Sequence, residues 1–228
     1  NHLSNKVIHV QDTPYSYLGI ANANVPSGRQ VFAGLNSAGF GIMNTVAANL
    51  PKKADEMEDL EGIIMADALR ICQTVEDFER YISVNLGPAL GSWANFGVFD
   101  ASGKAYLFEV HNHGYEKIDC AAADGHYMIN TNIARSGAPG KGDGYLRCDR
   151  ANQLFKAFES NQVDFQTILT RHTRDLGHAI LDQPGIHDAR TTPADHDLWI
   201  FTRDCINRPS TASAVVLVGK GPSDPNSV

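Results

Sequence analysis

The chain has 228 residues, of which 43% are hydrophobic and 20% are charged, and its formal net charge is −7. This is the composition of an ordinary globular protein, and it excludes collagen-like, disordered and coiled-coil chains. Lysine and arginine do not cluster in the sequence, so it lacks the basic face that a nucleic-acid partner requires. No apolar run approaches the ~18–20 residues of a membrane-spanning helix. We therefore expect neither a nucleic-acid partner nor a membrane span.

The first third of the chain predicts short strands, because runs of β-forming residues are separated by turn-forming clusters. The strands are expected over Lys6–Gln11, Ser16–Asn22, Gln30–Leu35 and Phe40–Ala47. The last two are joined by Asn36-Ser37-Ala38-Gly39, and the same chemistry recurs at Asp100-Ala101-Ser102-Gly103 between Asn95–Asp100 and Lys104–Val110. In each joint Asn or Asp bonds its own backbone and Gly supplies a positive φ, which predicts two hairpins.

Two helices are predicted between these hairpins. The first has apolar residues at helical spacing, at Leu60, Ile64, Ala68 and Ile71. Thr74 is the expected N-cap of the second, whose apolar face carries Val75, Phe78 and Ile82. Cys72 follows Ala68 at helical spacing, so we expect it to be a small core residue.

The second half of the chain predicts further elements of both kinds. A strand is expected over His126–Thr131, two helices around Ala151–Phe158 and Asp164–Leu176, and a last strand over Ala214–Val218. Strands and helices in this order indicate an α+β fold, most simply a four-layer αββα sandwich with two sheets between two helical layers. The sequence shows no internal repeat or linker, so we expect a single domain over residues 1–228.

Four candidate sites have simpler interpretations that we favour, which for the glycine-rich stretch is a flexible surface loop. The glycine-rich Gly137–Gly144 fails the phosphate-loop pattern, because Arg135 and Gly142 replace the required Gly and Ser/Thr. His111-Asn112-His113 and the patch His187–Asp197 could supply metal ligands, but neither has the spacing of a zinc-protease motif, and no metal is expected. His172 on an apolar helix face is interpreted as a hydrogen-bonded core histidine.

Carboxamides at strand ends are more informative. Asn44 lies on the otherwise apolar face of Phe40–Ala47, and Asn130 and Asn132 end the predicted strand His126–Thr131. A carboxamide in such a place needs hydrogen-bond partners, or else it has a functional role. It presents an uncharged N–H donor of the kind an oxyanion hole uses. The alternative for each residue alone is that Asn simply begins a turn.

Several segments, in order along the chain, carry a resemblance to one family. Gly34–Asn44 has the form Gly-x-Asn-x-x-Gly-apolar followed by Asn, and Asn95–Glu109 combines Asn-Phe, Asp-x-x-Gly and Glu. Asn130-Thr131-Asn132 is similar to a Thr-Asn strand end, Gly144–Arg147 to a helix start with Arg, and Arg208–Val216 to a Ser-rich segment before a late strand. Together they resemble the N-terminal-nucleophile hydrolases of the acyl-coenzyme A:6-aminopenicillanic acid acyltransferase and choloylglycine hydrolase type.

The resemblance implies an αββα sandwich that attacks linear, non-peptide amide bonds without a metal or organic cofactor. The family nucleophile is a cysteine exposed as the first residue by self-cleavage, and its own α-amino group can serve as the base. Asn132 would then donate to the oxyanion and Asn44 would help to hold substrate or oxyanion. Arg147 would orient the nucleophile or its carboxyl-side neighbours by charge-assisted hydrogen bonds. Asn95 is a fainter substrate-binding candidate, and the alternative is a structural residue beneath the site.

This sequence departs from the family pattern at the nucleophile. Asn1 cannot attack a carbonyl, and the four cysteines Cys72, Cys120, Cys148 and Cys205 lie mid-chain without a cleavage-like context. They also lack the Cys-x-x-Cys spacing of a zinc site. We therefore expect the nucleophilic cysteine upstream of Asn1, in which case the chain is an internal portion of the enzyme whose fold is incomplete at both ends.

Two rival functions stay open from the sequence. One is a non-catalytic relative that keeps the sandwich to bind a ligand, and the other is a metal-dependent hydrolase that uses His187–Asp197. In the favoured interpretation the partner is a small-molecule amide, hydrolysis and acyl transfer are equally open, and a homo-oligomer is compatible with the sequence. The acyl group and the cellular compartment cannot be read from these residues.

Overall fold

The computed structural model describes residues 5–26, 28–123, 127–141, 144–156, 165–170 and 172. These residues belong to two compact units. The sheet unit comprises the described residues from 5 to 128 together with 132–141, and the helical unit comprises 129–131, 144–156, 165–170 and 172. Each unit is described by itself, and the single domain expected over residues 1–228 stays a prediction. In the described part of the chain, no helix has the length and apolar character to cross a bilayer.

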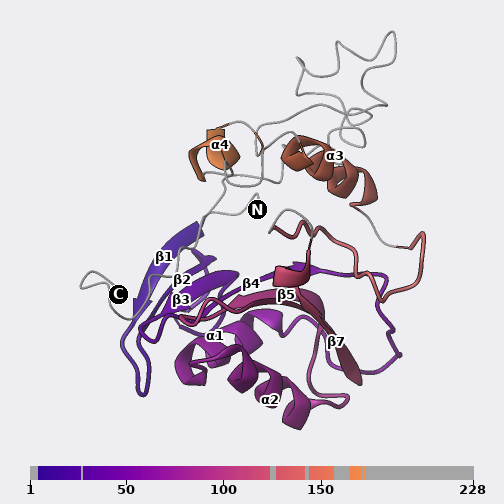
Figure 1. Ribbon diagram of the computed structural model, residues 1–228. Coiled ribbons are helices and arrows are strands. Elements are labelled where there is room, and N and C mark those ends of the chain that lie inside the picture. Colours follow the sequence, from indigo (N-terminus) through magenta and orange to yellow (C-terminus); the bar gives the residue numbers. More distant parts are fainter. Residues whose placement is uncertain are drawn as a thin grey trace. The chain divides into compact units, whose positions relative to one another are not determined.

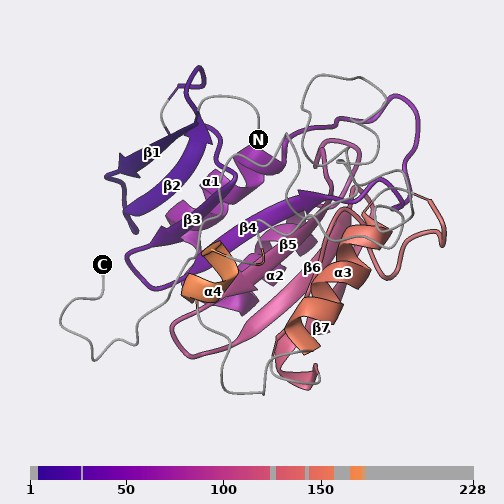
Figure 2. The same ribbon diagram turned by 90° about the horizontal axis from the view of Figure 1, so that it is seen from above.

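The sheet unit is built on seven antiparallel strands that pair in chain order, β1 to β7 (Figures 1 and 2). Their bounds are β1 Asn5–Val10, β2 Tyr17–Asn22, β3 Ala33–Asn36, β4 Gly41–Val46, β5 Trp93–Phe99, β6 Ala105–His111 and β7 Gly114–Asp119. Every neighbour in the sheet is also the next strand along the chain. Short turns join β3 to β4, β5 to β6 and β6 to β7, whereas the connection from β4 to β5 carries two helices. The strands expected in the first third of the chain are present, the third beginning later than predicted.

Both predicted hairpins are confirmed. Asn36 Oδ1 accepts hydrogen bonds from Ala38 N and Phe40 N, each at 3.0 Å, and Gly39 has a φ of 85°. In the β5–β6 turn, Asp100 Oδ1 accepts from Ser102 N at 2.9 Å, and Gly103 has a φ of 87°. A positive φ at the closing position is the conformation that glycine adopts without steric cost.

Two helices, α1 Glu61–Ile71 and α2 Val75–Asn85, cover one face of the sheet (Figure 1). Thr74 caps α2 as predicted: its side chain accepts from Asp77 N, and the Asp77 carboxylate accepts from the Thr74 backbone N–H. Asn36 also donates through Nδ2 to Leu69 O and Cys72 O at 2.9 and 2.7 Å. The turn therefore satisfies carbonyls at the end of α1 that have no partner within the helix.

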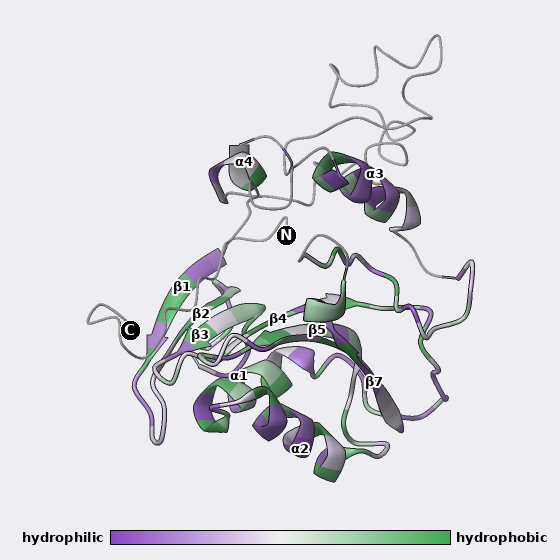
Figure 3. Ribbon diagram, viewed as in Figure 1, coloured by the Kyte–Doolittle hydropathy of each residue, from purple (hydrophilic) through white to green (hydrophobic). Residues whose placement is uncertain are grey.

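The hydrophobic core lies between this face and the two helices. Phe78 of α2 packs edge-on against Phe96 and Phe108, with ring centroids 5.6 and 5.2 Å apart. All three rings are fully buried, and such aromatic pairs add about 0.5–1.5 kcal/mol beyond the area they bury. Cys72 is 1% exposed in the same cluster, which confirms the prediction of a core cysteine. Hydrophobic stretches of strand and helix meet in this layer in Figure 3.

The opposite face of the sheet is partly apolar as well. Because side chains alternate along a strand, Val7, Leu18 and Met43 point away from the helices, and they are 75%, 38% and 42% exposed. Both α-helices described in the sheet unit lie on the other face. One sheet and its helices make the sheet unit α+β, as expected. The second sheet and second helical layer of the four-layer sandwich stay predictions.

The strand expected over His126–Thr131 is wrong for residues 127–131, which have no regular secondary structure. The seventh strand is instead Gly114–Asp119, which the sequence analysis missed, and it pairs with β6 from Tyr106↔Asp119 to His111↔Gly114. Charged side chains interrupt β7, so its apolar alternation is weak. The run at 127–131 has β-forming residues, but none of the described strands pairs with it. Pairing, rather than local preference, decides between the two.

The helical unit contains α3 Tyr145–Lys156 and α4 Phe165–Thr170, in agreement with the two helices expected there. His172 is buried, and its ring lies 4.8 Å from that of Phe155, as expected of a buried histidine, while the hydrogen bond expected for it stays a prediction. Several predictions fall outside the described residues. They are Phe158, the Asp164 cap, Leu176, the patch His187–Asp197 and the strand Ala214–Val218.

Candidate active site

The predicted oxyanion donor Asn132 begins a loop that crosses the end of the sheet. We call residues 132–138 the anchored loop, because most of its members bond to side chains or backbone oxygens elsewhere in the sheet unit. Asn132 itself donates through Nδ2 to Val46 O at 3.0 Å, at the last residue of β4. Its carboxamide is therefore held at the edge of the strand on which Asn44 lies.

Asn95 holds the next residue of the anchored loop. Its Nδ2 donates to Ile133 O at 2.9 Å and to Thr45 Oγ1 at 3.2 Å, and its side chain is almost fully buried. Asn95 lies in register with Thr45 on β4 and with Glu109 on β6. These contacts join Asn95 to a neighbouring strand and to the loop, and its role in substrate binding stays a prediction.

Asn49 binds the third residue of the loop through both its amide oxygen and its amide nitrogen, as the backbone of a neighbouring strand would. Its Oδ1 accepts from Ala134 N and its Nδ2 donates to Ala134 O, both at 2.8 Å, across 85 positions of sequence. The backbone oxygen of Asn49 also accepts from Ala138 N at 2.8 Å. Asn49 is 4% exposed, so each of these bonds replaces water that the groups cannot reach.

Glu109 holds the fourth and fifth residues and is the functional candidate that the sequence analysis missed. Its carboxylate is fully buried and accepts from Arg135 N at 2.5 Å and from Ser136 N at 2.7 Å. The signal was present in the sequence, because Glu109 interrupts the apolar strand Lys104–Val110. A buried carboxylate requires donors, and consecutive backbone N–H groups supply them.

The hydrogen bonds of the anchored loop do not include the other predicted site residues. Asn44 is half-buried and, by alternation, shares the face of Ile42 rather than that of Thr45 and Asn95. Asn130 donates to Thr131 O at 3.0 Å, and Thr131 Oγ1 donates to Gly144 O at 3.0 Å, all within the helical unit. Arg147 is 8% exposed in the first turn of α3. Its place beside Asn132 stays a prediction.

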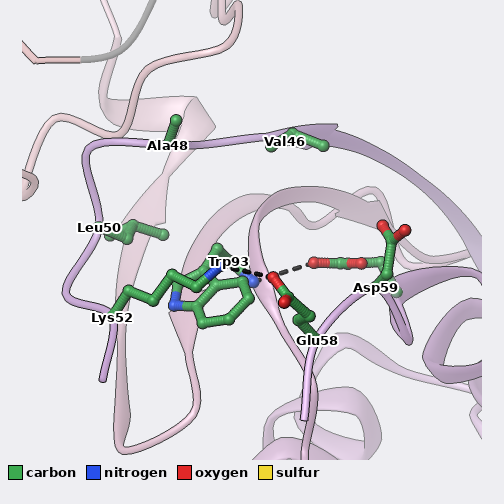
Figure 4. Close-up of a pocket in the computed structure, with 8 residues that line it drawn as sticks. Val46, Ala48, Leu50, Lys52, Glu58, Asp59 and Trp93 are labelled. Atoms are coloured by element: carbon green, nitrogen blue, oxygen red, sulfur yellow. Dashed lines mark hydrogen bonds and ion pairs between the residues drawn. The ribbon is translucent and has the colours of Figure 1, made fainter. Parts of the chain in front are cut away.

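A pocket of about 280 Å³ opens beside the end of β4 (Figure 4). Its lining residues are Val46, Ala48, Leu50, Lys52, Glu58, Asp59, Glu61 and Trp93. Lys52 Nζ lies 4.1 Å from the centre of the Trp93 ring and 2.5 Å from Glu58 Oε2. Burial raises the pKa of Glu61, although its carboxylate accepts from Trp93 N at 2.9 Å. The pocket is close to the anchored loop, because Val46 contributes both to its lining and to the bond with Asn132.

His111 and His113 of the sheet unit have structural partners. His113 Nε2 lies 2.5 Å from Glu56 Oε1, and His113 N donates to His111 Nδ1 at 3.3 Å. The hydrogen bond from His113 holds the pKa of Glu56 below its usual value, and burial lowers the pKa of His111. Among the residues that the structure describes, no group of three or more His, Cys, Asp or Glu side chains could hold a metal ion.

The described cysteines differ from an activated nucleophile. Burial raises the pKa of Cys72 to about 12 and also raises that of Cys120, whose Sγ lies 3.8 Å from Met128 Sδ. A reactive cysteine requires the opposite shift, because the thiolate is the attacking species. Cys148 is half-buried in α3, and Cys205 lies outside the described residues.

No protein-family model matches the chain, and no curated protein matches it significantly. Solved structures do. A Caenorhabditis elegans N-acylethanolamine-hydrolyzing acid amidase ortholog superposes with a TM-score of 0.50 at 11% identity, and the match covers 72% of this chain and 70% of the ortholog. A conjugated bile acid hydrolase from Clostridium perfringens gives a TM-score of 0.47 at 13% identity, and the match covers 73% of this chain and 70% of the hydrolase. Penicillin V acylase from Agrobacterium tumefaciens gives a TM-score of 0.41 at 15% identity, and the match covers 69% of this chain and 56% of the acylase.

The class of fold follows from the first of these likenesses. The chain shares its fold with the acid amidase ortholog, and this likeness of fold agrees with the resemblance drawn from the sequence motifs. At 11% identity the likeness concerns the fold, and the chemistry has to be argued from the residues.

Proposed function

We propose that this chain belongs to an N-terminal-nucleophile amidohydrolase, or acyltransferase, that acts on linear, non-peptide amide bonds. The single observation that carries the proposal is the anchored loop, which places the Asn132 carboxamide at the end of the sheet and holds the residues after it. A rigid, uncharged N–H donor is what stabilises a developing oxyanion. The fold shared with an acid amidase supports the same class of reaction.

In this proposal the nucleophile is a cysteine outside residues 1–228. The raised pKa values of Cys72 and Cys120 support that choice, since neither thiol is activated. The cysteine sulfur attacks the amide carbonyl carbon, and its proton passes to the α-amino group of the same residue. Collapse of the tetrahedral intermediate breaks the C–N bond, and the leaving amine takes the proton. Water, or an acceptor amine, then resolves the thioester.

Asn132 and Arg147 have distinct roles in this scheme. Asn132 donates to the carbonyl oxygen as it becomes an oxyanion, and loss of one such donor typically costs about 10²–10³ in kcat. Arg147 orients the nucleophile by charge-assisted hydrogen bonds. Its low exposure supports a fixed rather than a solvated side chain.

Asn44 is assigned to substrate or oxyanion binding by the resemblance, and its strand position provides a direct test. Thr45 is the adjacent residue and points to the opposite face. If Asn44 holds the substrate, Asn44→Ala raises KM or lowers kcat about tenfold or more, whereas Thr45→Val mainly weakens the bond to Asn95. Equal effects of the two substitutions would remove Asn44 from the site.

The experiment uses the product of the full natural coding sequence, because the proposed nucleophile lies outside this chain. It is assayed against a conjugated bile acid, penicillin V and an N-acylethanolamine, and is labelled with a thiol-reactive acyl probe. We expect turnover of one amide class and a single labelled cysteine outside residues 1–228. Asn132→Ala should abolish most turnover, and the control Asn85→Ala, an exposed carboxamide at the end of α2, should not.

The rival functions give different results in the same experiment. A folded protein that binds one of these amides without turnover or labelling is a non-catalytic binding protein. Turnover that a chelator abolishes, with no labelled cysteine, indicates a metal-dependent hydrolase. Either result would overturn the proposal.

A further inference from the structure

Glu109 is the one fully buried carboxylate in the described part of the sheet unit, and the proposed reaction gives it no chemical step. It lies in the middle of β6 between the buried Phe108 and Val110. Removing a carboxylate from water is costly unless strong hydrogen bonds replace the lost hydration. An apolar residue would meet the packing requirement of a strand interior without that cost. The placement of Glu109 therefore calls for an explanation beyond packing.

The two hydrogen bonds that Glu109 accepts provide this explanation. Oε1 accepts from Arg135 N and Oε2 accepts from Ser136 N, so each oxygen holds one of two consecutive backbone N–H groups. Only a carboxylate offers two equivalent acceptors and no donor in this geometry. A Gln side chain would turn an N–H₂ group towards one of the two N–H donors. An Asp side chain would be shorter by one methylene.

Glu109 also completes a row of side chains that crosses four strands. Thr45, Asn95, Glu109 and Glu116 are paired in register from β4 to β7. Asn95 holds Ile133, Asn49 holds Ala134, and Glu109 holds the following two residues. Each of the four residues that follow Asn132 is thus tied to the sheet unit. Glu116, at the exposed end of the row, is the natural control.

We propose that Glu109 is a positioning residue for Asn132: by accepting from Arg135 N and Ser136 N, it fixes the path of the anchored loop and so the place of the Asn132 carboxamide. This inference rests on the proposed function for its catalytic consequence. Misplacement of a catalytic group by about 1 Å can cost about 100-fold in rate, so a loosened loop has a kinetic effect even where Asn132 is intact.

The first test needs neither a variant nor activity. Amide hydrogen exchange of the full-length protein should show Arg135 and Ser136 protected to a degree similar to the central strands β5 and β6. Exchange of these two amides at the rate of an exposed loop would overturn the proposal, whether or not the protein is an amidase.

The second test compares Glu109→Gln and Glu109→Asp with the control Glu116→Gln. We expect kcat to fall about tenfold or more in Glu109→Gln, with a smaller fall in Glu109→Asp, KM nearly unchanged in both, and no effect in Glu116→Gln. The nuclear magnetic resonance signal of the Asn132 side-chain amide should shift or broaden in the same order. Glu109→Asp retains the carboxylate and covers the case in which Glu109→Gln does not fold.

The contrary results are equally specific. A fall in Tm with kcat and the Asn132 signal unchanged shows that Glu109 serves stability alone, and it overturns the proposal. If the wild-type protein lacks amidase activity, the proposed function fails, while hydrogen exchange and the Asn132 signal still decide whether Glu109 positions the loop.

Discussion

Asn95 and Glu109 face each other across β5 and β6 and hold the same loop by complementary chemistry. The amide of Asn95 donates to Ile133 O, and the carboxylate of Glu109 accepts from Arg135 N and Ser136 N. Both side chains are almost completely buried. A buried polar group that loses its partner costs about 1–3 kcal/mol, so the sheet and the loop stabilise each other and are expected to unfold together.

The bond between Asn49 and Ala134 gives a first stability prediction. Asn49→Ala removes two hydrogen bonds at 2.8 Å and leaves Ala134 N and O buried without these partners. We expect the free energy of unfolding to fall by about 2–4 kcal/mol, measured by urea denaturation. The control Asn85→Ala loses one exposed hydrogen bond to Tyr81 O and should change the stability by less than about 1 kcal/mol. A similar loss in both variants would contradict the anchoring role of Asn49.

Gly137 offers an independent test of the same contact. A Cβ atom at position 137 would lie 2.3 Å from Asn49 Nδ2 and 2.7 Å from Asn49 O, which is closer than van der Waals contact allows. Gly137→Ala should therefore displace Asn49 and lower the Tm by several degrees.

The matched variant for this prediction is Gly140→Ala, where a Cβ meets no atom within 4 Å but the backbone φ is +72°. It should show only the cost of a positive φ, about 1–2 kcal/mol. Hydrogen exchange at Ala134 separates the two variants, because only Gly137→Ala should expose this amide. Unchanged protection of Ala134 in Gly137→Ala would contradict the steric argument.

Asp100 predicts a pH dependence of stability. Burial acts to raise the pKa of its carboxyl group, but hydrogen bonds from Ser102 and the Val75 N–H hold that pKa below the usual value. Because the folded pKa lies below the unfolded one, the stabilisation is complete above the unfolded pKa of about 3.9 and is lost as the pH falls through the folded pKa.

We expect Asp100→Asn to lower the free energy of unfolding by about 1–3 kcal/mol at pH 7 and to weaken its decrease between pH 5 and pH 3, each followed by urea denaturation. The exposed Asp149 supplies the control Asp149→Asn, which should leave this decrease unchanged. The same acid sensitivity in wild type and Asp100→Asn would show that other carboxylates dominate.

Cys72 predicts resistance to alkylation. With its pKa raised by burial to about 12, on the order of one thiol in ten thousand is ionised at pH 8. Iodoacetamide should leave Cys72 unmodified in the folded protein and modify it after denaturation in urea, with the sites located by peptide mass spectrometry. Rapid labelling of Cys72 in the folded protein would contradict its burial and reopen it as a nucleophile.

Local features of the sheet unit were predictable. The turns at Asn36–Gly39 and Asp100–Gly103 depend on a side chain that bonds its own backbone and on a glycine with positive φ, and both requirements lie within four residues. The Thr74 cap likewise depends on Asp77, three positions later. Such interactions form between near neighbours in sequence, so the residue types alone determine them.

The strand wrongly predicted at 127–131 and the missed strand β7 show that local sequence does not predict which segments pair in the sheet. Tyr127–Thr131 has the composition of a strand and Gly114–Asp119 has less of it, but only the latter pairs with β6. Strand pairing is a contact between segments, so its outcome depends on which neighbour is available rather than on either segment alone.

The sequence by itself determined the hairpins, the helix cap, the buried Cys72 and the family resemblance of the fold. Only the tertiary structure decided that Asn49, Asn95 and Glu109 hold the loop that begins at Asn132. The partners of these side chains lie 26 to 85 positions away, and no local pattern encodes such a distance. A buried polar residue shows in the sequence that it needs a partner, and the fold selects which backbone group supplies it.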